Sequence, residues 1–463
     1  MIKKVLIANR GECALAILRS AKELGIKTVA VYTEVDFKEP IVYLADEAIC
    51  VGKNFSKDSY LNTEALITTA IQMGCDAIHP GYGFLSENFN FAKSVEENGL
   101  IFIGPPSDVI KAMSDKLIAK NLMKELSIPT VAGSNIKGLC DEEIKLICRK
   151  IGYPILIKSR FGGGGKGMRR VDDENKLLEL IELTRKEAQN SFGNNEVFVE
   201  KFIENPRHIE VQILSDGKKV IHLFERECSL QKNSQKIIEE APCYFISKTL
   251  KEKLYDASIK IAKDSNYVGA GTCEFLVDKD ENFYFMEMNT RLQVEHAVTE
   301  AITGIDIIKE QFRVASNLGI SFKQEDVKID GHSIEVRVNA TNPLKDFIPS
   351  SGEITFLLTP SGMDTRFESS IYKGSEISVF YDSMIAKIIV KDSTRLNAIK
   401  KMRRAIEETI IEGIDTNLGF LYAILFNKDF LRGNIDTSFI EKNQNLIIKE
   451  IEEVSNNFGT WSK

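Results

Sequence analysis

Residues 285–300 read Phe-Met-Glu-Met-Asn-Thr-Arg-Leu-Gln-Val-Glu-His-Ala-Val-Thr-Glu, and they decide the fold. If the run that begins at Phe283 is a strand, Glu287 and Asn289 point from the same face, because side chains alternate along a strand. Residues 271–277, Gly-Thr-Cys-Glu-Phe-Leu-Val, have the pattern of a second strand, and the polar residues between the two runs have that of a turn. The stretch therefore predicts a β-hairpin.

The predicted hairpin brings two acids together. With Val277 opposite Tyr284, Glu274 lies opposite Glu287, and two like charges at that spacing repel unless a cation lies between them. Two carboxylates and the amide oxygen of Asn289 suit Mg²⁺ or Mn²⁺, which take oxygen ligands and complete their coordination with water and nucleotide phosphates. A pair of solvated carboxylates at a sheet edge is the alternative, but the flanking residues are apolar. We predict a metal site at Glu274, Glu287 and Asn289.

Beyond the predicted metal site, Arg291, Gln293 and Glu295 again alternate. A fixed cation, an amide and a carboxylate suit an anionic substrate that the arginine holds and the glutamate deprotonates. A surface ion pair would use the same residues, and on composition alone it is the commoner explanation.

The run from Glu287 to His296, followed by Thr299-Glu300, resembles the signature of biotin carboxylases, a family within the ATP-grasp superfamily. The resemblance extends over residues 1–445. It implies an α/β protein with an N-terminal Rossmann-like parallel sheet, an ATP-grasp central domain that carries a mobile lid, and a mixed α+β C-terminal domain. The implied boundaries are 1–128 for the N-terminal domain, 129–204 for the lid, 205–330 for the catalytic domain and 331–446 for the C-terminal domain.

Composition excludes several classes of protein. A chain of 463 residues with 43% hydrophobic and 27% charged residues is typical of a soluble enzyme of about three domains. A net charge of −7 argues against a nucleic-acid partner, because phosphate binding normally needs a basic face. No apolar run is long enough to cross a bilayer, and the eight cysteines are not at zinc-ligand spacing. We expect a reduced, cytoplasmic protein without a membrane partner.

Residues 3–126 alternate between strand and helix. Short apolar runs predict strands at 5–8, 28–32, 76–79 and 100–103, and helical periodicity predicts helices at 13–24 and 63–73. This βαβ succession predicts a parallel sheet with helices on both faces. The glycine-rich loop 79–88 follows a strand end, where open α/β sheets bind ligands. The loop could serve the chain path alone, but its resemblance to a biotin carboxylase motif implies that Tyr82 faces the substrate.

Residues 129–204 have the features of a lid over a nucleotide. A buried strand ends at Lys158, and a glycine run follows whose backbone N–H groups can wrap phosphate oxygens beside lysine ammonium groups. The strand-like residues 168–171 after it argue against a dinucleotide fingerprint, and the spacing does not match a Walker loop. We predict a phosphate-binding hairpin of the ATP-grasp type, formed by Lys158, Gly163, Gly164, Gly165 and Lys166.

The resemblance assigns further residues to ATP. Lys116, which alone would be a solvated helix lysine, matches a lysine that contacts phosphate, and residues 197–203 resemble the segment that holds adenine. His208, which alone would more often be structural, matches a histidine that contacts the nucleotide. The nucleotide-binding residues implied in this way are Lys116, Glu200, Lys201, Ile203, His208, Gln231 and Ser234, together with Glu274 and Glu287.

Two segments depart from the family pattern. Relatives usually read Gln-Arg-Arg-His-Gln-Lys where this chain keeps both glutamines and Lys236 but has Asn233-Ser234. The replaced histidine normally helps to hold the nucleotide, which puts that contact, and with it ATP affinity, in doubt, although Ser234 can still donate one hydrogen bond. In the lid, Arg160-Phe161 replaces Ser-Gly, and the added bulk is expected to stiffen or re-aim it.

A third part begins near residue 331. Residues 331–340 alternate, which predicts a strand with Glu335, Arg337 and Asn339 on one face. Arg337 could be a cross-strand partner of Glu335 or of another carboxylate; the resemblance implies instead that it faces biotin. Further strands are predicted at 354–358, 365–368 and 377–381, and a helix at 395–410.

The resemblance implies an ATP-dependent biotin carboxylase, a ligase that forms a C–N bond. Its substrates would be ATP, bicarbonate and biotin, with Mg²⁺ as the metal. Bicarbonate would attack the γ-phosphoryl group to form carboxyphosphate, which breaks down to CO₂ and phosphate. Lys236 and Arg291 would hold bicarbonate, with Gln293 and Val294 beside it, Glu295 would be the general base, and Arg337 would stabilise the enolate of biotin.

The chain contains no Ala-Met-Lys-Met biotin-attachment motif. Biotin is therefore expected on a separate biotin carboxyl carrier protein, with carboxyltransferase subunits completing an acetyl-CoA carboxylase of fatty acid biosynthesis or a related enzyme. Family members are commonly homodimers. Two other interpretations stay open: an ATP-grasp ligase with another acceptor, and a regulatory relative without turnover, which the Asn233-Ser234 departure favours.

Overall fold

The computed structural model describes residues 1–161 and 167–458. Its N-terminal part is a five-stranded sheet in the order β3-β2-β1-β4-β5, in which every pair is parallel. Its elements are β1 (Lys4–Ile7), α1 (Gly11–Glu23), β2 (Lys27–Thr33), α2 (Pro40–Leu44), β3 (Glu47–Gly52), α3 (Thr63–Gln72), β4 (Ala77–His79), α4 (Phe89–Glu97), β5 (Ile101–Phe102) and α5 (Ser107–Ser114). The predicted Rossmann-like sheet is confirmed. The edge strand β3 was not predicted, although its residues 48–51 form a short apolar run; most of the strand is only partly buried.

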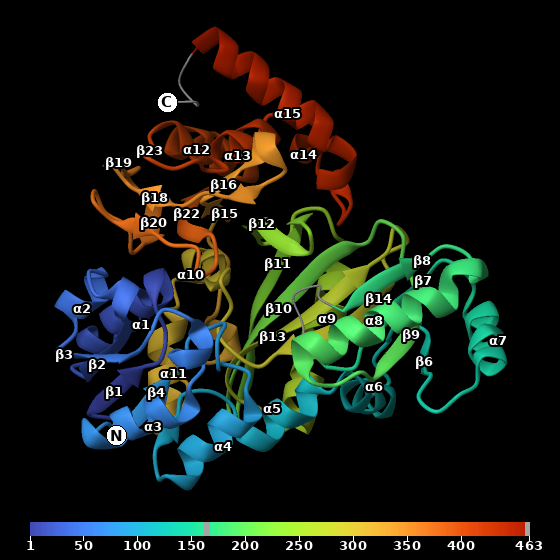
Figure 1. The fold of residues 1–463 in the computed structure, drawn as a ribbon, viewed down its shortest axis with the longest axis horizontal. Helices are drawn as coiled ribbons and strands as arrows, with labels where there is room; N and C mark the ends of the chain where they lie inside the picture. The colour runs from blue at the N-terminus through green and yellow to red at the C-terminus, as the bar shows by residue number, and fades with distance from the viewer. Residues whose placement is uncertain (162–166, 459–463) are drawn as a thin grey trace.

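The region predicted as a lid contains a four-stranded antiparallel sheet in the order β6-β9-β7-β8. Figure 1 shows it with α7 and α8 at one side of the molecule, away from the N-terminal sheet. Its elements, with the helix before them, are α6 (Lys116–Glu125), β6 (Gly133–Asn135), α7 (Asp141–Ile151), β7 (Ile155–Ser159), β8 (Met168–Val171), α8 (Leu177–Phe192) and β9 (Val197–Lys201). The predicted phosphate residues Gly163, Gly164, Gly165 and Lys166 lie outside the described residues.

An eight-stranded antiparallel sheet runs through the centre of the molecule in the order β14-β13-β10-β11-β12-β15-β22-β20. Its strands are β10 (Arg207–Asp216), β11 (Val220–Lys232), β12 (Gln235–Ala241), β13 (Val268–Val277), β14 (Phe283–Asn289), β15 (His332–Asn339), β20 (Thr365–Ser369) and β22 (Met384–Asp392). The accompanying helices are α9 (Lys248–Asp264), α10 (His296–Thr303) and α11 (Ile307–Ala315). Because β12 pairs with β15, the sheet continues across the boundary predicted at residue 331.

The two faces of this sheet have different chemistry. Apolar side chains of β10, β13 and β14, such as Val211, Phe275 and Phe285, pack in one buried cluster with Leu254 of α9. Because side chains alternate along β10 and β13, the polar residues of these strands project from the opposite face. On β14 the alternation is interrupted between Phe285 and Glu287, so that Glu287 pairs with Glu274 on that opposite face. The core thus fixes one side of the strands and leaves the other to carry the site.

The register of the predicted hairpin is correct in the half that carries the acids. Glu274 lies opposite Glu287, but Val277 lies opposite Phe283 instead of Tyr284. The register shifts by one residue next to Glu274, which is the mark of a β-bulge. The prediction from the sequence assumed an uninterrupted ladder. The pairs between the bulge and the turn were therefore predicted with a register that is wrong by one residue.

The C-terminal part adds short strands and helices to the end of the central sheet. They are β16 (Thr341–Asn342), β17 (Ile348–Pro349), β18 (Gly352–Glu353), β19 (Phe356–Leu358), β21 (Glu376–Ile377), α12 (Arg395–Glu407), β23 (Ile410–Glu412), α13 (Leu418–Ile424), α14 (Lys428–Arg432) and α15 (Phe439–Phe458). The strand predicted at 377–381 is wrong beyond Ile377, where Val379 is exposed and the chain bends. Among the described residues, no helix has the length and apolar character needed to cross a membrane.

Candidate active site

Two facing acids of β13 and β14 form the centre of the site. Glu274 accepts hydrogen bonds from Lys236 Nζ, Asn289 Nδ2 and Gln293 Nε2, each at 2.8 Å. Burial would raise the pKa of Glu274, but Lys236 holds it well below its usual value. Burial and then the charge of Glu274 raise the pKa of Glu287 on the facing strand. The two carboxylates therefore repel each other, as their predicted register requires.

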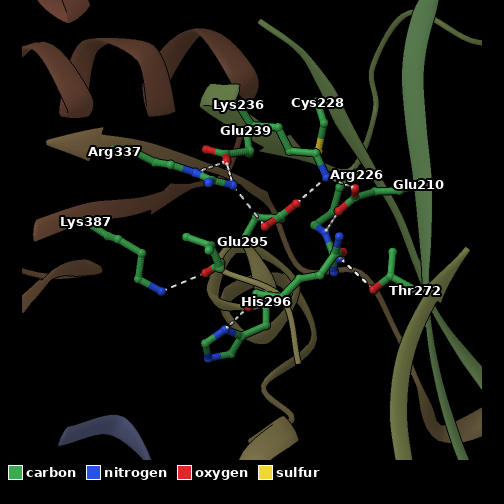
Figure 2. A network of polar contacts seen from close by, with 12 residues as sticks. Glu210, Arg226, Cys228, Lys236, Glu239, Thr272, Glu295, His296, Arg337 and Lys387 are labelled. Carbon is green, nitrogen blue, oxygen red and sulfur yellow. Dashed lines mark hydrogen bonds and ion pairs between the residues drawn. The ribbon is translucent and has the colours of Figure 1, made fainter. Parts of the chain in front are cut away.

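Lys236 of β12 is the cation that joins the acids. Its ammonium group donates to Glu210 and to Glu295, each at 2.5 Å (Figure 2). It also donates to Glu274 at 2.8 Å. Burial would lower the pKa of Lys236, but these three carboxylates hold it well above its usual value, so the amine stays charged. The structure thus brings the predicted bicarbonate lysine into direct contact with the predicted base.

Arg226 of β11 is fully buried near Lys236, and both side chains donate to Glu210. Its guanidinium donates to Glu210 at 2.5 Å and to Gln293 Oε1 at 2.8 Å. It also donates to Gln212 Oε1 at 2.7 Å, Thr299 Oγ1 at 2.9 Å and Thr272 Oγ1 at 3.1 Å. A planar guanidinium with fixed donors orients several acceptors at once, so Arg226 sets the positions of residues from four elements.

Residues 290–295 connect β14 to α10 as a loop and do not continue the strand. Arg291 folds back on the chain: its Nε donates to Glu87 Oε2 at 2.8 Å and its Nη2 donates to Asn289 Oδ1 at 2.9 Å. Arg291 is thus linked to Lys236 through Asn289 and Glu274. The carbonyl of Val294, another predicted substrate residue, accepts a hydrogen bond from Lys387 Nζ at 2.7 Å.

Glu295, the predicted base, lies between two cations. One carboxylate oxygen accepts from Lys236, and the other accepts from Arg337 Nη2 at 3.0 Å. Burial would raise the pKa of Glu295, but Lys236 and Arg337 hold it well below its usual value. Arg337 also donates from Nε to Glu239 at 2.6 Å. The predicted base and the predicted biotin-facing arginine therefore belong to one ion-pair network.

The predicted phosphate lysine Lys158 and the unpredicted Lys120 contact a different acid, Glu200. Lys158 of β7 pairs with Glu200 at 2.8 Å, and Lys120 of α6 pairs with the other oxygen of Glu200. Burial would raise the pKa of Glu200, but Lys158 and Lys120 hold it below its usual value. Lys116 Nζ lies 3.4 Å from the carbonyl oxygen of Ser159, and its charge interacts with Glu287 and Lys158.

The base of the predicted lid is tied to α6 through Arg160. Arg160 donates from Nη2 to Asp115 at 2.6 Å and from Nη1 to Glu196 at 2.7 Å. Asp115 is also the N-cap of α6, because it accepts from the backbone N–H of Leu117 at 3.0 Å. The residue that replaces the family's serine thus connects the end of β7 to the start of the helix that carries Lys116.

The adenine-segment residues Lys201 and Ile203 lie at and just after the end of β9. Lys201 Nζ donates to the carbonyl oxygens of Gly152 and Tyr153 at 2.9 and 3.0 Å. Ile203 is half-buried. The structure therefore gives Lys201 a contact with the chain before β7 and leaves the adenine role of both residues a prediction.

His208 of β10 connects the nucleotide residues to the acids. Its Nε2 lies 3.1 Å from Glu274 Oε2, and its Nδ1 lies 2.8 Å from Gln231 Nε2.

The Asn233-Ser234 segment is the two-residue turn between β11 and β12, with φ values of +52° and +63°. Such a turn matches the twist of a hairpin, and Asn tolerates the left-handed conformation. Ser234 is exposed there. The replacement of the family's Arg-His by Asn233-Ser234 therefore suits the conformation of the hairpin turn.

The glycine-rich loop after β4 packs against the loop after β1. Asn9 Nδ2 donates to the carbonyl oxygens of Pro80 and Tyr82 at 2.7 and 2.8 Å. Gly81 has a φ of +62°, and a Cβ there would lie 2.5 Å from Cys13 Sγ, so the path requires glycine. Glu87 at the end of the loop receives the Arg291 ion pair. Tyr82 therefore sits on a segment that is bonded to the predicted bicarbonate arginine.

Comparison with known proteins identifies the family. Family models match the chain as biotin carboxylase, N-terminal domain, over residues 1–110, carbamoyl-phosphate synthase L chain, ATP binding domain, over residues 115–323, and biotin carboxylase C-terminal domain over residues 335–442. Biotin carboxylase 1 of Bacillus subtilis is 49% identical over 445 residues, 95% of this chain and 98% of that protein. The chain belongs to the biotin carboxylase family.

Two solved structures of this family have nearly the same fold. One is the biotin carboxylase domain dimer of Hydrogenobacter thermophilus 2-oxoglutarate carboxylase in complex with MgADP, ADP and bicarbonate, with a TM-score of 0.93, 45% identity, and coverage of 96% of this chain and 99% of that chain. The other is a biotin carboxylase–β,γ-ATP complex from Campylobacter jejuni, with a TM-score of 0.93, 44% identity and the same coverage of both chains. The predicted biotin carboxylase fold is confirmed.

The donor set of this biotin carboxylase fits a divalent cation. Glu274 and Glu287 face each other, and the raised pKa of Glu287 reflects burial and then the neighbouring Glu274 charge. A hard cation removes that repulsion and prefers carboxylate oxygens. Asn289 fits less directly, because the amide oxygen it would offer accepts the Arg291 hydrogen bond.

Several residues of the biotin carboxylase site were not predicted from the sequence: Glu87, Glu210, Arg226, Glu239 and Lys387. Two carried a usable signal. Glu210 follows His208 by two residues and therefore shares its face of β10. Lys387 stands alone in the apolar run 384–390, where a solvated lysine is unexpected. Arg226 and Glu239 lie among several charged neighbours in sequence, and spacing could not separate them.

Proposed function

We propose that this protein carboxylates biotin at the expense of ATP and bicarbonate. One observation carries the proposal: Lys236 contacts Glu295 and Glu274, while Glu295 contacts Arg337. The acids suited to a metal, the base and the biotin-facing arginine are therefore members of one network. The family membership, with relatives named biotin carboxylase, supports the same activity.

The nucleotide would lie between this network and the lid. Lys158, Lys116 and Lys166 would hold its phosphates, Glu200, Lys201 and Ile203 its adenine end, and His208 and Gln231 would contribute from β10 and β11. Mg²⁺ bound by Glu274 and Glu287 would neutralise phosphate charge as the γ-phosphoryl group transfers. Movement of residues 129–204 as a lid would exclude water from the reaction.

Bicarbonate would bind at Lys236 and Arg291, with Gln293 and Val294 beside it. An anion that takes hydrogen bonds from Lys236 offsets the charge of one of the cations that hold the pKa of Glu295 low. Anion binding therefore strengthens Glu295 as a base at the moment when it must accept the bicarbonate proton. The deprotonated oxygen then attacks the γ-phosphorus, ADP leaves, and carboxyphosphate forms.

Carboxyphosphate would then release CO₂ and phosphate, and phosphate would take the ureido proton of biotin. Arg337, charged and fixed by Glu239 and Glu295, would stabilise the enolate oxygen that results while the biotin nitrogen attacks CO₂. Tyr82, on the loop tied to Arg291, would line the biotin side. ATP, bicarbonate and biotin would thus yield ADP, phosphate and carboxybiotin.

We propose that biotin arrives on a carrier protein and that carboxyltransferase subunits use the product. A homodimer is the proposed assembly, since the Hydrogenobacter thermophilus domain was crystallised as a dimer. The acceptor that is finally carboxylated is left open, because relatives of this chain belong to carboxylases of different substrates. All eight cysteines are free thiols, which supports a reducing compartment such as the cytoplasm.

The test is phosphate release from Mg-ATP by the purified protein, measured with and without bicarbonate and with and without free biotin. The proposal predicts bicarbonate-dependent release that biotin stimulates. Turnover that needs a different acceptor, such as an amine, would instead identify another ATP-grasp ligase. Absence of turnover with every acceptor would identify a regulatory relative.

A further inference from the structure

Lys387 is a buried cation from the C-terminal part of the chain that reaches into the active-site loop. It lies on β22 with a side chain that is 0% exposed. Its Nζ donates to the carbonyl oxygen of Val294 at 2.7 Å (Figure 2). The same Nζ lies 3.0 Å from Glu368 Oε2. Val294 immediately precedes Glu295, so this contact holds the peptide unit that joins them.

The position of Lys387 is costly for the fold. In the strand register Lys387 lies directly opposite Arg337 of β15, and like charges in facing positions destabilise a sheet. A buried lysine also loses its hydration. On its other side Lys387 lies opposite Glu368 of β20, and this ion pair offsets part of the cost, but it does not account for the hydrogen bond that Lys387 donates to the Val294 carbonyl.

The hydrogen bonds of Lys387 show what it is used for. Two more acids, Glu335 and Glu12, interact with its charge. Within the described ranges, both oxygens of Glu335 and Oε2 of Glu12 are buried without a hydrogen-bond partner. Lys387 thus makes its shortest contact with a neutral main-chain carbonyl, while two nearby carboxyl groups keep unpartnered oxygens. The Lys387 ammonium group is therefore shared between one carboxylate, that of Glu368, and a peptide carbonyl of the active-site loop.

We infer that Lys387 is a positioning residue for the reaction: it fixes the Val294–Glu295 peptide, and through it the carboxylate that is to act as the base. The inference rests on the proposed function, in which Glu295 takes the bicarbonate proton. The hydrogen bond between His296 Nδ1 and the Gln293 carbonyl oxygen, at 2.7 Å, fixes the neighbouring peptide of the same loop. Lys387 adds a constraint on this loop that comes from β22.

The test compares four variants with the wild-type full-length protein. Lys387→Met keeps the length of the side chain and removes the donor; Glu368→Gln removes the ion pair and keeps the donor; the third variant combines the two. Lys391→Met, on the same strand, is the matched control, because its ammonium pairs with exposed Asp330. The readouts are kcat with biotin, KM for ATP, the unfolding midpoint, and hydrogen–deuterium exchange of peptides that cover residues 290–300.

Lys387→Met is expected to lower kcat about 10- to 100-fold, the usual effect of losing a residue that orients a reactive group, with KM for ATP changed less than about twofold. Glu368→Gln and Lys391→Met are expected to stay within about threefold of wild type, as residues without a role in positioning should. The double variant should regain the unfolding midpoint lost in Lys387→Met without regaining kcat. Exchange in residues 290–300 should rise only where the Lys387 donor is missing.

Two results would overturn the inference: a folded Lys387→Met or double variant with wild-type kcat, or unchanged exchange in residues 290–300 of that variant. If Lys387→Met does not fold, the double variant, in which neither partner is charged, supplies the measurement. A wild-type protein without biotin-stimulated turnover would refute the proposed function instead. The exchange data would then still show whether Lys387 holds the loop.

Discussion

The two sides of the active site differ in their balance of acids and cations. On the sheet side, Glu210, Glu239, Glu274, Glu287 and Glu295 surround Lys236, Arg226 and Arg337. On the lid side, Lys116, Lys120 and Lys158 surround Glu200. Among the described residues of these two clusters, acids outnumber cations on the sheet side and cations outnumber acids on the lid side. A metal cation suits the first cluster and nucleotide phosphates suit the second.

The contrast also concerns how the residues are held. Apart from Glu295, which lies in the loop 290–295, members of the sheet cluster project from adjacent strands of one sheet whose other face is core, and hydrogen bonds join most of them. The lid cluster is divided between α6, β7 and β9 and is tied together by Glu200 and Arg160. Electrostatic catalysis needs fixed groups, whereas nucleotide entry needs an element that can open. The more rigidly held sheet cluster therefore suits catalysis, and the lid cluster, which is divided between separate elements, suits nucleotide entry.

The largest expected effect comes from removing the charge of both metal-binding acids. Glu274→Gln with Glu287→Gln takes away several kcal/mol of charge stabilisation, and kcat for ATP cleavage should fall by about 10³-fold or more. The measurement is the initial rate of phosphate release at saturating bicarbonate. Asp280→Asn in the turn of the same hairpin is the control and should keep the wild-type rate. Equal rates for the double variant and wild type would mean that the sheet side does not bind the metal.

The next largest effect is expected at Arg226, whose replacement should lower the free energy of unfolding. Arg226→Met leaves Glu210 buried with one fewer cation, and breaking a buried ion pair from one side costs about 3–5 kcal/mol of the free energy of unfolding. Urea denaturation measures the loss. Arg170→Met on the lid, where Arg170 pairs with exposed Asp172, should cost less than about 1 kcal/mol. Similar losses in the two variants would remove the distinction between a fixed side and a loosely held side.

Glu12 of α1, whose carboxyl group interacts with the charge of Lys387, should make the free energy of unfolding depend on pH. Burial raises the pKa of Glu12 to about 7, so its contribution to stability is full below its usual pKa of 4.5 and is lost as pH rises through 7. Glu12→Gln should therefore match wild type near pH 5 and be more stable at pH 8, by up to roughly 3 kcal/mol. Urea denaturation at both pH values tests this. Parallel pH dependences would show that Glu12 is ionised in the folded protein.

The smallest effect is expected at Ser234. This side chain is exposed in the hairpin turn, so Ser234→Ala should change the dissociation constant for ADP by less than about twofold. Gln231→Ala, which removes the partner of His208 Nδ1, is the comparison and should weaken binding more. Calorimetric titration with ADP gives both values. A tenfold loss in Ser234→Ala would show that the serine replaces the family's histidine as a ligand.

The sequence predicted the residues that lie close together along the chain, and it missed residues that only the order of the strands in the sheet brings together. The hairpin acids and Glu295 lie within one stretch of chain, and strand alternation with an apolar core face was enough to pair Glu274 with Glu287. The bulge next to Glu274 was not predictable, because alternation assumes an uninterrupted ladder. Arg226 and Lys387 depend on which strands are neighbours in the sheet, and short-range periodicity carries no information about that. The loop at 290–295 alternates in sequence, yet Arg291 turns it back towards Glu87.

The most direct measurement is the effect of Mg²⁺ on ADP binding, compared between wild type and the Glu274→Gln/Glu287→Gln variant by calorimetric titration. If the facing acids of β13 and β14 bind the metal that meets the nucleotide, Mg²⁺ will strengthen ADP binding in wild type and will not do so in the variant, while metal-free ADP still binds to both. An equal gain from Mg²⁺ in the two proteins would contradict the assignment of the metal to these acids.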